Sequence, residues 1–132
     1  MSVFVAFEWQ TQHALVALAF RSAHGSFSYF LPGVIAPLFR FSVIAPHAAE
    51  ELLDWGFAAE DGPSAITVPL ALQNQQFGAL TLLVRAQANM LRLSDRQSRS
   101  QILLGIDFLA KFHKTTLLFH YDEPSRAELR LE

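Results

Sequence analysis

The sequence of 132 residues contains no cysteine. Disulfide bonds, thiolate catalysis and metal sites built from cysteine are therefore excluded. Charged residues make up only 17% of the chain, and its 10 Lys and Arg residues are scattered. A protein that follows a phosphate backbone needs a basic stripe, so we expect no nucleic-acid partner.

Long apolar runs are also missing. No segment is apolar over the length of a bilayer, and no secretory signal is apparent at the N-terminus. We therefore expect a cytoplasmic protein without membrane contact, and the lack of cysteine fits a reducing compartment. Even so, 52% of the residues are hydrophobic and 12 are Phe. Such a chain must hide a large core or present an apolar face to a partner, and we expect a homodimer.

Signatures of catalysis and cofactor binding are scarce. The five histidines include His113 and His120, whose spacing matches no metal-ligand pattern. The serines lie in no Gly-x-Ser-x-Gly turn, and the isolated glycines form no phosphate-binding loop. We expect neither a metal nor a cofactor.

The length indicates a single domain that spans residues 1–132. Alternating and compact apolar segments predict a mainly β chain with two short helices. Pro32-Gly33 is expected to end a strand, and the tail at 128–131 is expected to pair at a sheet edge. The other strands are expected at 2–12, 14–20, 27–31, 65–73, 76–85, 102–104 and 115–121, and the helices at 46–56 and 107–112.

Two segments carry a family resemblance. In the first, the strand Ile102-Leu103-Leu104 runs into Gly105, and Asp107, Phe108 and Leu109 follow after one residue. This Gly-x-Asp-Phe-Leu pattern resembles the C-terminal signature of retropepsin-like aspartic proteases. The second is Phe41-Ser42-Val43-Ile44-Ala45-Pro46, which resembles the segment after the catalytic loop of that family.

The resemblance implies a retropepsin-like (acid protease) closed β-barrel. One short helix would follow the Gly-x-Asp-Phe-Leu motif, and another would lie near residues 46–55. In the family, the position of Asp107 is structural and braces the start of the helix. Ile106 stands where the family often has Arg, so an ion pair common in the family is missing here.

The catalytic aspartate of this family has no counterpart, because residues 1–53 contain no Asp. The Asp-Thr/Ser-Gly triplet should precede Ser42. One alignment places Ala36-Pro37-Leu38 there, and another places Gly33-Val34-Ile35. Neither triplet supplies a carboxylate or a hydroxyl, whereas the chemistry requires two aspartates that share a proton. The sequence therefore points to the fold and argues against its chemistry.

Three functional hypotheses follow. We expect a pseudoprotease, a non-catalytic relative that dimerises or binds a peptide or protein, since strand addition in a cleft needs no catalysis. Phe30, Leu38, Phe39 and Phe41 are the candidate residues for this binding or dimer loop, and core packing is their alternative interpretation. The second hypothesis is an active aspartic endopeptidase that uses Asp54 or Asp61. The third is an unrelated small β-barrel that ends in the same motif.

Overall fold

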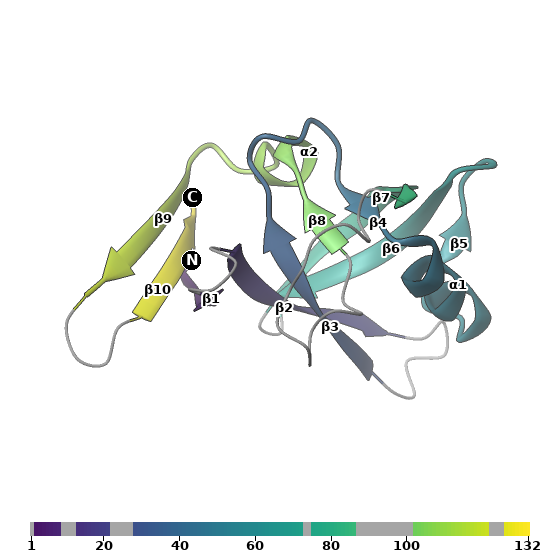
Figure 1. The fold of residues 1–132 in the computed structure, drawn as a ribbon, viewed down its shortest axis with the longest axis horizontal. Coiled ribbons are helices and arrows are strands. Elements are labelled where there is room, and N and C mark those ends of the chain that lie inside the picture. Colours follow the sequence, from purple (N-terminus) through teal and green to yellow (C-terminus); the bar gives the residue numbers. More distant parts are fainter. Residues whose placement is uncertain (1, 9–12, 22–27, 73–74, 87–101, 122–125) are drawn as a thin grey trace.

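The computed structural model describes residues 2–8, 13–21, 28–72, 75–86, 102–121 and 126–132. Within these residues the chain forms ten strands and two short helices (Figure 1). The helices are α1 (Pro46–Asp54) and α2 (Ile106–Leu109). The strands are β1 (Ser2–Glu8), β2 (His13–Arg21), β3 (Ser28–Ile35), β4 (Val43–Ile44), β5 (Ala59–Glu60), β6 (Ala65–Leu72), β7 (Gln75–Val84), β8 (Ile102–Leu104), β9 (Thr115–His120) and β10 (Arg126–Leu131).

The strands pair in the order β5-β6-β7-β4-β8-β3-β2-β1-β10-β9. β2 and β3 pair as antiparallel neighbours, and β8 lies between β3, to which it is parallel, and β4, to which it is antiparallel. One further pair, Ala19 with Ala71, links β2 to β6. The mainly β architecture with two helices confirms the expected fold class. Closure into a barrel stays a prediction.

Helix α1 begins at Pro46, as predicted, and ends at Asp54, two residues before the predicted end. Pro46 occupies its first turn, where the missing amide hydrogen loses no helical bond. Gly56 adopts a φ of 78° just after the helix and donates its amide to the carbonyl of Leu53 at 3.2 Å. A glycine tolerates this left-handed conformation far better than other residues, which explains the stop.

Pro32-Gly33 does not end a strand, so that prediction is wrong. β3 continues through both residues to Ile35. Among the described residues, β8 pairs with β3 from Gly33 onward, so Pro32 has no described ladder partner on that side of β3, where a residue without an amide hydrogen is tolerated. A Cβ on Gly33 would lie 2.6 Å from Cδ1 of the buried Leu18, so the glycine makes room for a core side chain.

The tail is also not an edge strand. β10 pairs with β1 on one side and with β9 on the other, so β9 is the one at the end of the sheet among the described strands. Buried and exposed residues alternate in β10: Ala127, Leu129 and Leu131 are buried, while Arg130 is exposed. This alternation shows that one face of the strand lies on the core. The prediction failed because the same alternation occurs in edge strands and in inner strands.

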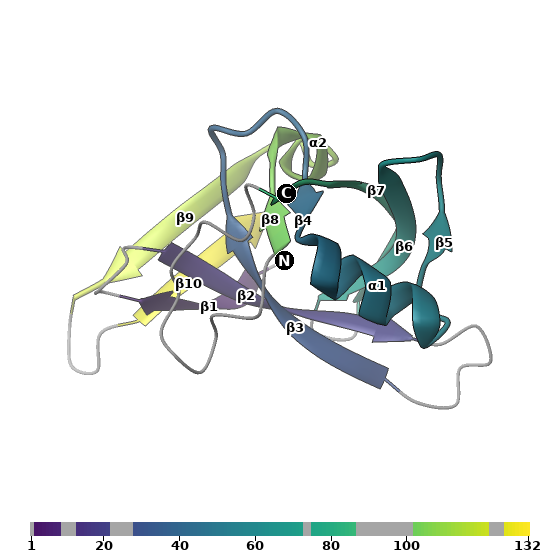
Figure 2. The same ribbon diagram turned by 45° about the vertical axis from the view of Figure 1, so that its right-hand side comes forward.

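Most of the largest buried side chains come from both halves of the chain and form one core. They are Phe20, Phe57, Phe108, Leu18, Ile44, Leu52, Ile66, Leu82, Ile102 and Leu104. Leu103 packs with Val34 and Ala36 in a second, smaller cluster. Figure 2 shows α2 and the loop that joins β3 to β4 next to each other at the top of the molecule.

Candidate functional site

The loop of residues 36–42 joins β3 to β4 and crosses the end of β8. The amide of Ala36 donates to the carbonyl of Leu104 at 2.8 Å, and the amide of Phe39 donates back to Ala36 at 3.1 Å, which closes a turn. The carbonyl of Phe39 in turn accepts the amide of Ile106 at 2.8 Å. Backbone hydrogen bonds therefore fix this loop, which we call the 36–42 loop, to the start of α2.

Ser42 and Asp107 join the loop to the helix through a second set of bonds. The Ser42 hydroxyl donates to Asp107 Oδ1 at 2.7 Å and accepts the amide of Gly105 at 2.9 Å. The Ser42 amide donates to Oδ1 and Oδ2 of Asp107 at 2.9 and 3.0 Å. Oδ1 also accepts the amide of Phe108 at 2.8 Å, so one carboxylate serves the helix start and the loop together.

Gly105 allows the loop to pass this close. A Cβ at this position would lie 2.7 Å from the carbonyl oxygen of Phe39 and 2.9 Å from the carbonyl carbon and oxygen of Phe41. All of these are backbone atoms, which cannot rotate away as the end of a side chain can. The glycine of the Gly-x-Asp-Phe-Leu motif is therefore a point of contact between two backbones. In the same motif, Phe108 fills the core and Leu109 packs against it.

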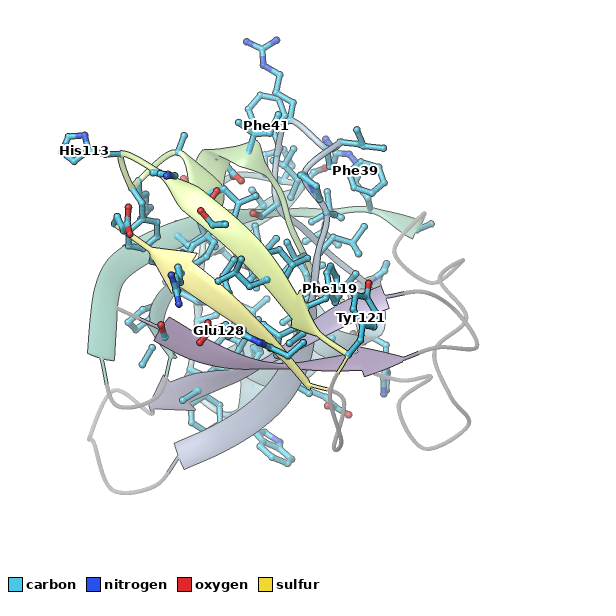
Figure 3. The ribbon with its side chains drawn as sticks, turned by 90° about the vertical axis from the view of Figure 1, so that its left-hand side faces the viewer. Phe39, Phe41, His113, Phe119, Tyr121 and Glu128 are labelled. Atoms are coloured by element: carbon cyan, nitrogen blue, oxygen red, sulfur yellow. The ribbon has the colours of Figure 1, made fainter. Side chains whose placement is uncertain are left out.

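The tip of the 36–42 loop presents apolar side chains to solvent. Leu38 is 96% exposed, and Phe39, Phe41 and Ile106 are each about half exposed. Figure 3 shows Phe39 and Phe41 pointing away from the body of the molecule, and the Arg40 guanidinium lies 5.3 Å from the centre of the Phe41 ring. We call Leu38, Phe39, Phe41 and Ile106 the apolar loop surface.

The predicted binding residues divide into two groups. Leu38, Phe39 and Phe41 lie together on one loop, whereas Phe30 lies within β3 opposite Ala19, and its side chain is outside the described part of the structure. Ile106 was missed as a member of this surface. Its signal was present in the sequence, because an apolar residue stands where the resemblance implies Arg.

The two candidate positions of the catalytic triplet differ in structure. Gly33-Val34-Ile35 lies inside β3 and pairs with β8, while Ala36-Pro37-Leu38 forms the turn. Asp54 is the exposed last residue of α1. Asp61 is exposed, and its Oδ2 accepts the hydroxyls of Thr67 and Thr81 at 3.1 and 3.4 Å. Both aspartates therefore lie on other elements than the 36–42 loop.

A second polar group lies on β9 and β10. Glu128 Oε1 is 3.5 Å from His120 Nε2 and 3.1 Å from Arg130 Nη2. Desolvation acts to raise the pKa of Glu128, but the hydrogen bonds and charges of His120 and Arg130 outweigh it and hold the pKa below its ordinary value of 4.5.

Within the described ranges, no group of three or more His, Asp or Glu side chains is placed to hold a metal ion. Neither described helix has the length and apolar character that crossing a membrane requires.

The fold is similar to that of a solved structure. No family profile and no curated protein sequence matches the chain. The crystal structure of a retropepsin-like aspartic protease from Rickettsia conorii is similar, with a TM-score of 0.55 and 12% sequence identity. The match covers 100% of this chain and 92% of that chain. At this identity the similarity concerns the fold.

Proposed function

We propose that this chain is a retropepsin-like pseudoprotease, a non-catalytic domain that associates through the apolar loop surface with a second copy of itself or with a peptide or protein. The fold it shares with an aspartic protease supports the first half of the proposal. The proposal includes a barrel closed through the pair of β2 with β6.

The observation that carries the proposal is an apolar loop held rigid at the surface. Exposed side chains on a mobile loop lose conformational freedom when they bind, and this loss weakens binding. The 36–42 loop is already fixed by Ser42, Asp107 and its backbone bonds to α2. Large apolar side chains fixed in this way are typical of the residues that dominate binding energy at interfaces.

The residues of the 36–42 loop lack the carboxylate that proteolysis by this fold requires. An aspartic protease polarises water with two carboxylates that share a proton. Ala36, Pro37 and Leu38 offer only methyl, ring and isobutyl groups in the turn. The alternative of an active endopeptidase would require Asp54 or Asp61, which lie on α1 and beside the β6–β7 pair. No observation favours that alternative, and the third hypothesis of an unrelated barrel is opposed by the structural match.

The test is the mass of the protein in solution. We expect Phe39→Ser with Phe41→Ser to weaken self-association, measured by light scattering over a range of concentrations, without changing the circular dichroism spectrum. Trp55→Ser is the matched control, because Trp55 is exposed to a similar extent but lies at the end of α1. An equal loss of association in both variants would remove the special role of the loop. If the loop variant associates as strongly as the wild type, self-association does not use this surface. Comparing the binding of a selected peptide to the wild type and to the loop variant would then test the peptide-binding alternative.

A further inference from the structure

Arg40 places a positive charge among the side chains of the apolar loop surface. It stands between Phe39 and Phe41 in the chain, and its carbonyl accepts the amide of Asp107 at 3.3 Å, which ties its backbone to the start of α2. Its guanidinium lies over the Phe41 ring, 5.3 Å from the ring centre. This contact restricts the side chain, so Arg40 is oriented before a partner arrives and loses less freedom on binding.

No carboxylate in the described part of the chain neutralises Arg40. The ion pairs of the described residues lie on α1 or on β9 and β10. The carboxylate of Asp107 is engaged elsewhere, since it accepts the hydroxyl and the amide of Ser42 and the amide of Phe108. Arg40 is exposed, and its guanidinium carries five N–H donors and no acceptor. These donors can therefore bind an anionic group of a partner.

The segments that form this end of the molecule carry more positive than negative charge. Residues 9–49 contain Arg21 and Arg40 but neither Asp nor Glu. Residues 106–114, which begin with α2, contain Lys111, Lys114 and a single acid, Asp107. Both lysines are exposed. An anionic partner is favoured here, because opposite charges speed the encounter of two molecules and fix their relative position.

We propose that the apolar loop surface binds a segment of a second protein in which an Asp or Glu stands between apolar residues, and that Arg40 binds its carboxylate. This inference rests on the proposed function and names the chemistry of the partner. A planar guanidinium can donate two parallel hydrogen bonds to one carboxylate. Phe39 and Phe41 would contact the apolar residues on either side and exclude water, which strengthens the ion pair.

The geometry favours a peptide carboxylate over the headgroups of a lipid surface. Anionic membranes attract clusters of basic side chains, each of which adds a similar increment of binding. Within the apolar loop surface, Arg40 is the only basic residue, and Phe41 sets its orientation. One oriented, planar cation between two aromatic side chains matches one carboxylate at a defined distance from apolar groups.

Selection from a phage-displayed library of random short peptides tests the predicted chemistry without a known partner. The purified full-length chain is immobilised, and the peptides that it retains are sequenced. We expect these peptides to share an Asp or Glu with an apolar residue on each side. We also expect them to bind the variant with Phe39→Ser and Phe41→Ser weakly, because both aromatic contacts are then lost.

A cycle of peptide and protein variants measures the contribution of Arg40. One selected peptide is synthesised with its acid and with the matching amide, Asn or Gln, and binding is followed by fluorescence anisotropy. We expect the amide peptide to bind the wild type about tenfold more weakly, and both peptides to bind Arg40→Gln about equally. Arg85→Gln is the matched control: Arg85 is also exposed but follows β7, so this variant should keep the full difference. Circular dichroism checks that each variant is folded.

The possible outcomes separate this inference from the proposed function. Selected peptides without a preference for acids, or an Arg40→Gln variant that still distinguishes the two peptides, would overturn carboxylate binding by Arg40 and leave the proposed function standing. If no peptide is selected, binding to vesicles of phosphatidylcholine with phosphatidylserine would assign the surface to lipid headgroups. Self-association that depends on Phe39 and Phe41 would in that case assign it to a second copy, and either result would overturn the inference. Cleavage of the selected peptides would instead refute the proposed function and leave the preference for a carboxylate intact.

Discussion

Changing Ser42 to Ala removes a hydroxyl that serves two partners at once. It accepts the Gly105 amide at 2.9 Å and donates to Asp107 Oδ1 at 2.7 Å, and Ser42 itself is fully buried. We predict that this change lowers the free energy of unfolding by about 2–4 kcal/mol.

The magnitude has two parts. The buried Gly105 amide loses its acceptor, and a buried donor without a partner costs about 1–3 kcal/mol. The bond from the Ser42 hydroxyl to the Asp107 carboxylate is charge-assisted, but Asp107 is partly exposed and keeps the amides of Ser42 and Phe108 as donors. Its loss therefore costs less than the roughly 1.5–3 kcal/mol of a bond to a charged group, at about 1 kcal/mol.

A double-mutant cycle isolates this interaction. Ser42→Ala, Asp107→Ala and the double variant are unfolded in urea and followed by circular dichroism. Since both single changes break the same hydroxyl–carboxylate bond, the double variant should lose less than the sum, with a coupling energy of about 1–2 kcal/mol. Asp107→Asn is a useful control, because its amide oxygen still accepts backbone hydrogens. Effects that add to within about 0.5 kcal/mol would refute the idea that Ser42 and Asp107 act as one unit.

Three further outcomes follow from the structure. Gly105→Ala should destabilise the fold by about 3 kcal/mol or more in urea unfolding, since its Cβ would meet backbone atoms of the 36–42 loop; wild-type stability would contradict the close approach. Gly33→Ala should cost less, because its nearest neighbour is the movable side chain of Leu18; a larger loss than for Gly105→Ala would be contrary to this ranking. Glu128 has a lowered pKa, so its contribution to stability is present above its ordinary value of 4.5 and disappears as the pH falls through the folded value. Glu128→Gln should therefore lower the melting temperature at neutral pH but not in acid, and an equal deficit at both would argue against the linkage.

Local patterns predicted much of this fold. The strand at 102–104, the glycine after it and the helix that includes Asp107 follow each other within a few residues, so sequence periodicity and turn chemistry identify them. The same is true of α1, which lies between Pro46 and Gly56. The sequence signals that identify both segments come from residues close to one another in the chain.

The sequence did not predict which residues far apart in the chain contact one another. Ser42 and Asp107 are separated by 65 positions, and no local rule connects them. Pro32 looked like a strand end because the start of β8 relative to β3 is set by the tertiary fold. The apolar residues of 37–41 fit a core equally well. Their exposure became evident only when the backbone bonds showed the loop passing over Gly105.

Digestion of a diverse peptide mixture by the purified chain tests whether the chain lacks proteolytic activity. The mixture is incubated from acid to neutral pH and analysed by mass spectrometry, in parallel with the Asp54→Asn and Asp61→Asn variants. The proposed function predicts the same peptide set with and without the protein at every pH. Cleavage that pepstatin inhibits, and that either variant abolishes, would contradict it.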